Sequence, residues 1–201
     1  MEILSNGLGL SAIVFLPIVS ALVITFIPKS YEKLIKGLAV LYSVLTFLIS
    51  VVLLLEFNFS NASQLQLGTK VSWIESINAN YEIGIDGISL PLLILSTFIS
   101  VLAIVYSLEH LPEPKSPKGF LALILVLETG MNGTFVALDL ILFFVFFEIV
   151  LLPMYFMIGI WGDKTIRSVS GFKKEIETRL YASIKFFVFT LFGSAFMLLG
   201  F

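Results

Sequence analysis

Glu148 lies in the middle of the most apolar run of the chain, which extends from Leu140 to Pro153. A carboxylate in a lipid interior costs on the order of a few kcal/mol, and such a residue almost always faces a protein interior or a water path. Its own helix offers it no polar partner. We therefore predict that Glu148 belongs to a functional site that transfers protons.

A second carboxylate, Glu128, lies ten residues before the predicted turn at Leu138, and Glu148 lies ten residues after it. At 1.5 Å per residue, both are about 15 Å from one surface, near the midplane of a core about 30 Å thick. Two like charges at close range cannot both ionise cheaply, and a carboxyl that titrates near neutral pH can carry protons. Alternatively, Glu128 is protonated and only hydrogen-bonds Asn132, four residues further along.

The composition that surrounds these carboxylates is typical of a membrane protein. The 201-residue chain is 58% hydrophobic and 13% charged, about half the charge of a soluble domain. Six stretches approach the roughly 20 apolar residues that a spanning helix needs. They predict an all-α, polytopic transmembrane bundle with spans over residues 10–27, 34–55, 88–108, 120–138, 140–160 and 180–201. Residues 58–84 are predicted to form an outer loop and residues 161–179 an inner loop.

The turn between the fourth and fifth spans, and the orientation of the bundle, follow from charge. Asp139 can accept hydrogen bonds from the first free amides of the fifth span, which predicts a tight turn at Leu138 and Asp139. Eleven of the twelve lysines and arginines fall on one face, and Lys70 alone falls on the other. The positive-inside rule places the eleven in the cytoplasm or a matrix, so we expect the N-terminus to lie outside.

Other residues within or beside the spans have two possible roles. Lys185 is about 7 Å into the sixth span, so it could join Glu148 through a water-bridged relay or extend to the interface. Pro153 lacks an N–H, frees the carbonyl of Ile149 and could kink the helix. Asp86 is suited to cap the third span. Gly130 and Gly133, together with the segment Gly193-Ser-Ala195, are expected to allow close helix packing.

Several chemistries are excluded by composition. Without cysteine, this chain cannot hold Fe–S clusters or thiolate zinc, and its single histidine makes a histidine metal site implausible. No basic cluster with interleaved aromatic residues indicates nucleic-acid binding.

Three blocks, in order, resemble one family. The first is Trp73-Ile74 with the segment from Gly84 to Leu92. The second runs from Phe143 to Gly162 and contains Glu148, and the third runs from Ala182 to Ser194. Together they are similar to the antiporter-like subunit of respiratory complex I, called chain M in bacteria and subunit 4 in mitochondria.

The resemblance implies a proton-translocating subunit of NADH–quinone oxidoreductase, built of about fourteen helices in two inverted repeats. It implies that Glu148 is an essential glutamate, that Lys185 matches a lysine of many bacterial members, and that Asp86 and Pro153 set helix geometry. NADH, FMN, Fe–S clusters and quinone would belong to partner subunits, and this chain would hold no cofactor. A bacterial inner membrane is the expected location, with a mitochondrial inner or thylakoid membrane as alternatives.

The chain also departs from the family pattern. It stops at Phe201 without the family's later helices, which suggests a truncated product, a split gene or an incomplete reading frame. Six helices would not complete a proton half-channel. Two alternative functions stay open: a subunit of a multi-subunit sodium/proton antiporter or membrane-bound hydrogenase, and an inactive structural remnant.

Overall fold

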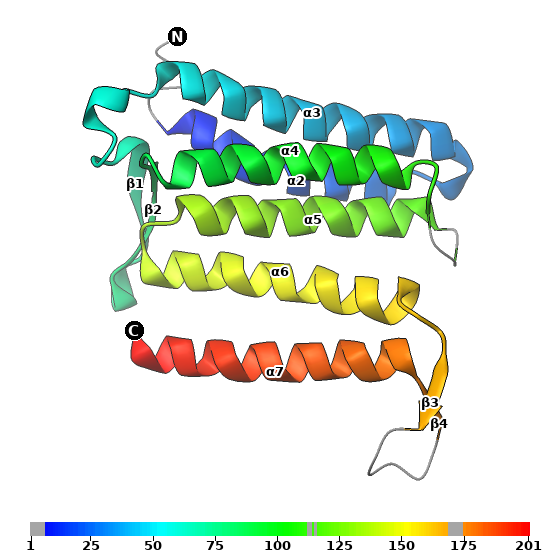
Figure 1. Cartoon of the computed structure of the whole chain (residues 1–201). Coiled ribbons are helices and arrows are strands. Elements are labelled where there is room, and N and C mark those ends of the chain that lie inside the picture. The colour runs from blue at the N-terminus through cyan, green and yellow to red at the C-terminus, as the bar shows by residue number, and fades with distance from the viewer. Residues whose placement is uncertain (1–6, 112–113, 115, 169–174) are drawn as a thin grey trace.

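Six long helices form the body of the protein (Figure 1). The computed structural model describes residues 7–111, 114, 116–168 and 175–201. The helices are α2 (Leu8–Phe26), α3 (Glu32–Glu56), α4 (Ser89–Ser107), α5 (Pro117–Val136), α6 (Leu140–Trp161) and α7 (Thr178–Gly200). All six are long and apolar enough to cross a membrane. The predicted helical bundle is confirmed, and each helix ends within three residues of a predicted span end.

Two β-hairpins occupy the segments that the sequence had predicted as loops. Strands β1 (Gln66–Ile74) and β2 (Ala79–Ile85) pair antiparallel within the predicted outer loop, and β3 (Ile166–Ser168) pairs with β4 (Glu175–Glu177) in the inner one. Between β1 and β2, the 3-10 helix η3 (Glu75–Ile77) leads into Asn78, whose φ of 52° is left-handed. Asparagine tolerates that conformation better than most residues, so it suits this turn. Two further 3-10 helices are η1 (Lys29–Tyr31) and η2 (Phe59–Asn61).

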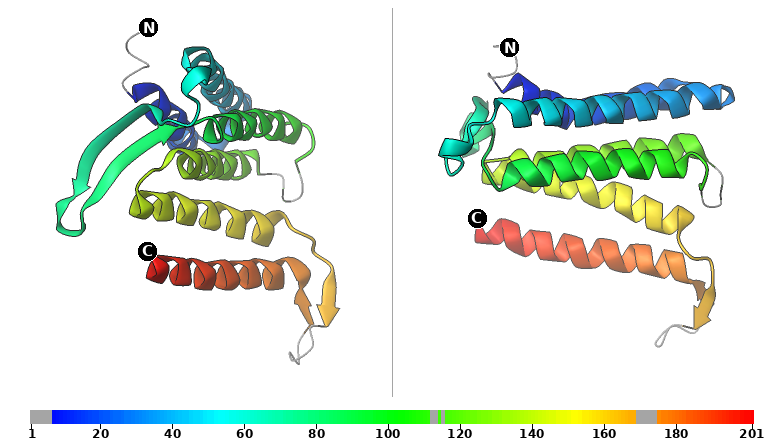
Figure 2. Two further views of the ribbon diagram at one scale, coloured as in Figure 1. Left: turned by 60° about the vertical axis from the view of Figure 1, so that its left-hand side comes forward. Right: turned by 45° about the horizontal axis from the view of Figure 1, so that its top comes forward.

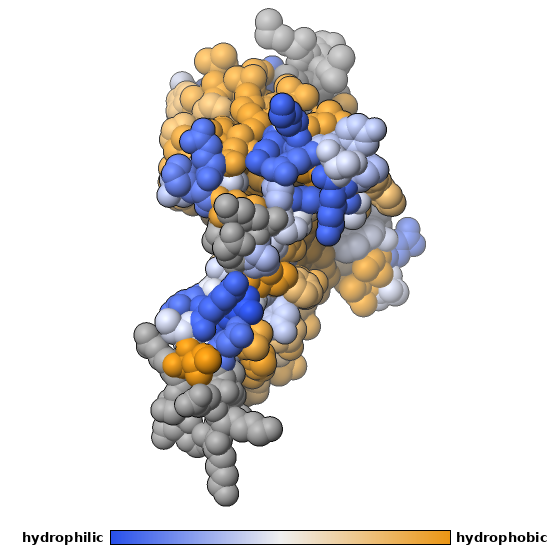
Figure 3. Space-filling view, turned by 90° about the vertical axis from the view of Figure 1, so that its right-hand side faces the viewer, coloured by the Kyte–Doolittle hydropathy of each residue, from blue (hydrophilic) through white to orange (hydrophobic). Residues whose placement is uncertain are grey.

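The helices form a four-helix unit with two helices added at one side. Helices α2, α3, α4 and α5 pack together, α6 packs on α5, and α7 packs chiefly on α6 (Figures 1 and 2). We call the end that carries β1 and β2 the hairpin end, and the opposite end the lysine end. Figure 3 looks onto the lysine end and shows hydrophilic residues gathered over it. Lys115, Lys173 and Lys174, predicted for the same face, lie outside the described residues.

The α2–α5 unit, together with β2 and the start of α6, has apolar clusters toward both ends and buried polar residues between them. The cluster at the hairpin end contains Leu10, Ile13, Val14, Leu53, Phe57, Ile83, Ile85, Leu90, Leu93, Val136, Leu142 and Phe146. The cluster at the lysine end contains Ala21, Ile24, Ile35, Ala39, Ile104, Leu121, Ile124 and Leu125. Between them lie buried polar side chains, here called the polar layer: Ser20, Ser43, Thr46, Ser50, Ser96, Thr97, Ser100, Glu128, Thr129 and Asn132.

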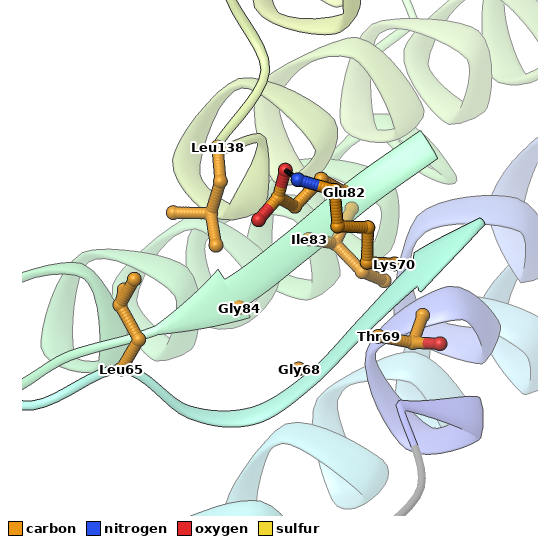
Figure 4. A pocket seen from close by; sticks show the side chains of 8 residues that line it. All are labelled: Leu65, Gly68, Thr69, Lys70, Glu82, Ile83, Gly84 and Leu138. Carbon is orange, nitrogen blue, oxygen red and sulfur yellow. Dashed lines mark ion pairs between the residues drawn. The ribbon is translucent and has the colours of Figure 1, made fainter. Parts of the chain in front are cut away.

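The β1–β2 hairpin holds the turn between α5 and α6. The backbone N–H of Leu138 donates to the carbonyl of Glu82 at 2.9 Å, and the N–H of Asn80 donates to Asp139 Oδ2 at 2.9 Å. In Figure 4, Leu138 lies beside β2 at a pocket of about 300 Å³, and Lys70 forms a 2.7 Å ion pair with Glu82. The hairpin therefore fixes where α6 begins.

Asp139 caps α6 as the sequence predicted. Its Oδ1 accepts hydrogen bonds from the N–H groups of Ile141 and Leu142 at 2.9 and 3.1 Å. Burial raises the pKa of Asp139, but the hydrogen bonds from Asn80, Leu142 and Ile141 and the charge of Lys70 outweigh it. The net pKa is therefore below the ordinary value of 3.8.

Candidate proton-transfer site

Glu148 lies on the face of α6 that packs against α7. It shares a helical stripe with Tyr155 and Gly159, which follow at seven and eleven residues. The ring of Tyr155 is 5.4 Å from that of Phe187, centroid to centroid. A Cβ added to Gly159 would lie 3.3 Å from Ser183 Oγ. Both contacts are with α7, so the stripe that carries Glu148 faces that helix.

The same contacts place Ser194 opposite Glu148. From Gly159 to Tyr155 the α6 contact moves back four residues, and from Ser183 to Phe187 the α7 contact moves forward four. Continuing this antiparallel register for seven residues pairs Glu148 with Ser194. Ser194 is 3% exposed in a half of α7 that is otherwise largely exposed.

The polar atoms at this level are suited to proton exchange. Oε1 of Glu148 is buried and has no hydrogen-bond partner in the described part of the chain. The Ser194 hydroxyl donates to the carbonyl of Leu191 at 3.0 Å. Its oxygen can still accept a hydrogen bond from a protonated carboxyl, and the hydroxyl can rotate to donate to an ionised one. Glu148 can therefore keep a polar neighbour in either protonation state.

Sequence reasoning missed the position of Ser194 opposite Glu148 and grouped this serine with Gly193 as a site of close packing. A Cβ added to Gly193 would meet nothing within 4 Å, so that glycine is not at a close contact among the described residues. The available signal was the spacing of Ser183, Thr190 and Ser194, which places three hydroxyl side chains on one stripe of an otherwise apolar helix.

Lys185 lies on the other side of α7. It follows Ser183 by two residues, which is about 200° around the helix, and its side chain is exposed. Its Nζ lies 5.6 Å and 5.8 Å from the ring centroids of Tyr181 and Phe189. This arrangement of α6 and α7 does not support the predicted relay between Glu148 and Lys185. A proton-transfer role for Lys185 stays a prediction.

Glu128 does not face Glu148, and the prediction of two carboxylates at close range is wrong. A Cβ added to Gly130 or Gly133 would meet Val150 and Phe146 respectively, so these glycines face α6 and confirm the predicted close packing. Glu128 is about 200° around α5 from Gly130 and points into the α2–α5 unit, where it is 0% exposed. The contacts of Gly130 with Val150 and of Gly133 with Phe146 set the register of α5 against α6. This register places Glu148 about 5 Å, or one turn, nearer the hairpin end than Glu128.

The alternative hydrogen bond between Glu128 and Asn132 is also not formed. Asn132 Oδ1 accepts from the hydroxyl of Ser96 at 2.9 Å, and its Nδ2 donates to the carbonyl of Ile13 at 3.4 Å. Pro17 explains this partner, because it lacks the N–H that would otherwise bond the Ile13 carbonyl. Asn132 thus satisfies the backbone carbonyl that Pro17 frees, and it makes no hydrogen bond to Glu128.

Pro153 and Asp86, the two residues predicted to set helix geometry, lie inside α6 and at the start of α4 respectively. Pro153 is buried inside α6, which continues through it to Trp161. Asp86 precedes α4, and its Oδ1 accepts from the backbone N–H groups of Ser89 at 2.7 Å and Ile88 at 3.0 Å. These two hydrogen bonds hold the pKa of Asp86 below its ordinary value. Asp86 therefore satisfies free amides where α4 begins.

Comparison with known families decides the relationship. Residues 12–134 match the family described as NADH-ubiquinone oxidoreductase chain 4, amino terminus. The chain belongs to this family. Residues 137–201 match the membrane family described as NADH:quinone oxidoreductase/Mrp antiporter. The boundary between the two matches falls at the turn that separates the α2–α5 unit from α6 and α7.

Individual relatives agree with this assignment. The chain is 37% identical over 196 residues to NADH-quinone oxidoreductase subunit M of Rickettsia bellii, covering 95% of this chain and 36% of the relative. It is 35% identical over 192 residues to NADH-ubiquinone oxidoreductase chain 4 of Marchantia polymorpha, covering 96% and 36%. The chain thus spans about a third of the length of these two relatives.

Solved structures share the fold. A chain of respiratory complex I from Thermus thermophilus superposes with a TM-score of 0.70 at 24% identity, over 92% of this chain and 33% of that one. A chain of an archaeal membrane-bound sulfane sulfur reductase superposes with a TM-score of 0.69 at 18% identity, over 95% and 26%. The six-helix arrangement therefore recurs in respiratory membrane complexes.

Proposed function

We propose that this chain acts as a proton-translocating membrane subunit of NADH–quinone oxidoreductase, with Glu148 as its proton-transfer residue. The observation that carries the proposal is the position of Glu148, a carboxyl with a buried, unpartnered oxygen on the stripe of α6 that faces α7. A structural role would not require a carboxyl among apolar neighbours, because burial of an unpaired polar group costs free energy.

In this function the chain contributes proton transfer and no redox chemistry. NADH, FMN, Fe–S clusters and quinone are bound by partner subunits, and the other membrane subunits of the complex are its direct partners. Quinone reduction elsewhere changes the local electrostatics, and the carboxyl of Glu148 takes up and releases a proton in response. Ser194, on the facing stripe of α7, is placed to exchange a hydrogen bond with that carboxyl. Lys185 would exchange protons only with groups that cover the outer face of α7.

The proposed setting is the inner membrane of a bacterium, with the hairpin end outside. The lysine-rich loops between α2 and α3, α4 and α5, and α6 and α7 support this orientation. The match of residues 12–134 to chain 4 favours the oxidoreductase over a sodium/proton antiporter, because only the match of residues 137–201 is shared with antiporters.

The test is Glu148→Gln in the assembled enzyme, with proton pumping and quinone reduction measured in vesicles. We expect assembly to be retained and pumping to fall to about a tenth or less, because removal of a proton-transferring group typically costs two or more orders of magnitude in its step. Glu109→Gln is the matched control, since this exposed carboxylate follows the end of α4. Normal pumping in an assembled Glu148→Gln enzyme would contradict the proposal.

The same vesicles distinguish the antiporter alternative. An oxidoreductase subunit supports quinone-driven pumping in buffers without sodium, whereas an antiporter subunit requires a sodium gradient. A structural remnant would support neither, and Glu148→Gln would then change nothing.

A further inference from the structure

We propose that the polar layer holds a cluster of bound water molecules around Glu128, which forms a closed hydrated chamber within helices α2–α5. The chamber lies on the side of α5 away from Glu148 and is independent of the proton-transfer site proposed above. Its ligand is water, bound by one carboxyl and at least two serine hydroxyls.

Three side chains in the layer lack protein partners. Both carboxyl oxygens of Glu128, the hydroxyl of Ser20 and the hydroxyl of Ser43 are buried, and none has a hydrogen-bond partner within the described ranges. All three residues are 0% exposed. Buried polar groups in native proteins are nearly always bonded to protein or to ordered water, so three unpartnered groups in one layer indicate bound water.

The two serine hydroxyls are directed into the layer. A serine in a helix can satisfy its hydroxyl by donating to a carbonyl three or four residues back. Neighbours in the layer do so: Ser100 donates to the carbonyl of Ser96 at 2.9 Å, and Thr46 donates to that of Tyr42 at 2.9 Å. Ser20 and Ser43 do not use this partner, so their hydroxyls point to other groups in the interior.

Helix contacts bring the unpartnered groups to similar depths. The hydrogen bond from Ser96 to Asn132 sets the register of the antiparallel helices α4 and α5. One turn nearer the lysine end, Ser100 of α4 is therefore level with Glu128 of α5. The hydrogen bond from Asn132 to the Ile13 carbonyl sets the register of α2 against α5. One turn nearer the lysine end, Pro17 of α2 is therefore level with Glu128. Ser20 is less than one turn beyond Pro17, so Glu128 and Ser20 lie within reach of bridging water.

The α3 helix completes the chamber. Ser50 and Thr97 share a hydrogen bond of 3.0 Å, which sets the register of α3 against α4. Ser43 lies seven residues before Ser50 on the same face, at the level of Ile104, one turn beyond Ser100. A water molecule typically makes about three hydrogen bonds, which a carboxyl, two hydroxyls and neighbouring waters can supply here.

The chamber is closed at both ends. The apolar cluster at the hairpin end and the one at the lysine end cover the layer on either side, and their central members, such as Leu10, Leu93 and Leu125, are 0% exposed. Water in this layer is therefore a resident part of the structure. It does not form a path across the membrane, and protons reaching Glu128 would stay within the chamber.

Stability measurements on Ser20→Ala and Ser43→Ala test the proposal by the sign of the change. In a hydrated chamber each change removes a hydrogen-bond partner of bound water, and we expect the apparent Tm in lipid nanodiscs to fall by about 2–4 °C. In a dry interior each change removes an unsatisfied polar group, and the Tm would stay the same or rise. Either of these last results would overturn the proposal.

The control and a direct observation complete the test. Ser107→Ala is the matched control, because the hydroxyl of Ser107 is buried outside the layer and already donates to the carbonyl of Ile104 at 2.7 Å. A high-resolution density map of the full subunit in its complex should show water peaks within hydrogen-bond distance of Glu128. An empty interior, or a peak that disappears in sodium-free and potassium-free buffer and is therefore a cation, would contradict bound water.

Discussion

The α2–α5 unit and the contact between α6 and α7 both contain a membrane-embedded glutamate, but they surround it differently. Glu128 is enclosed by four helices and lies in a polar layer between two apolar clusters. Glu148 lies where two helices meet, with one stripe of α7 as its neighbour. The same side chain is therefore enclosed in one region and lies at a contact between two helices in the other, which is where we propose proton transfer.

The largest expected difference between the two regions appears when each glutamate is shortened by one methylene to aspartate. Glu148→Asp withdraws the carboxyl from α7 and from Ser194, and we expect pumping in the assembled enzyme to fall on the order of tenfold or more. Glu128→Asp should leave pumping nearly unchanged, because bound water can fill the space. Pumping is measured as the initial rate of vesicle acidification. Equal losses of pumping in the two variants would show that the two glutamates do not differ in function.

A second prediction concerns the contact that joins the regions. Gly133→Ala places a Cβ against the ring of Phe146, and a Cβ at Gly130 would meet Val150, so α5 and α6 depend on both glycines. We expect Gly133→Ala to lower the free energy of unfolding by about 1–3 kcal/mol. Gly37→Ala is the control, since its Cβ would meet nothing within 4 Å, and it should stabilise α3 by up to about 1 kcal/mol. Thermal unfolding in detergent separates these outcomes.

A third prediction sharpens the assignment of Ser194. Ser194→Ala removes the hydroxyl opposite Glu148 and should reduce pumping about fivefold, which corresponds to the loss of one hydrogen bond. The infrared C=O band of protonated Glu148 should shift to higher wavenumber, because a carbonyl without a hydrogen bond has a stronger C=O bond. Ser194→Thr should restore both properties. An unchanged band in Ser194→Ala would show that the hydroxyl does not contact Glu148.

The smallest expected effect concerns the turn between the regions. Because the folded-state pKa of Asp139 is lowered, its contribution to stability is present above its ordinary pKa of 3.8 and is lost as the pH falls through the folded-state pKa. We expect Asp139→Ala to cost about 1 kcal/mol at neutral pH and to unfold with a weaker dependence on pH below about 4. A variant that keeps the acid sensitivity of the original chain would show that other carboxyls cause it.

The sequence predicted the helices well and the direction of their side chains poorly. Runs of about 20 apolar residues and a single Asp139 were enough to locate six helices and the turn before α6. In α6, however, nearly every residue is apolar, so no contrast between faces indicated where Glu148 points. Counting residues from the turn gave depth alone, which is why Glu128 and Glu148 were predicted to lie together.

The β1–β2 hairpin was missed for a related reason. Asn and Ser residues at Asn58 to Ser63 indicate a loop and obscure the strand that follows at Gln66–Ile74. Ser194 was missed because its environment depends on how α7 packs against α6, and local sequence patterns do not encode that packing. The proline at position 17 was visible in the sequence, but its effect on Asn132 required the register of α2 and α5.

The attachment of the β1–β2 hairpin has a mechanical consequence. Leu138 and Asp139 are hydrogen-bonded to Glu82 and Asn80 of β2, and Tyr81 on the same strand hydrogen-bonds Ser11 of α2 at 2.9 Å. Strand β2 thereby joins α2 to the turn between α5 and α6 at this end. Helix α7 packs on α6 and follows the short β3–β4 pair at the far end, and within the described residues it makes no hydrogen bond to the β1–β2 hairpin. A change in how α7 packs on α6 would therefore alter the surroundings of Glu148 without breaking the hydrogen bonds of the β1–β2 hairpin.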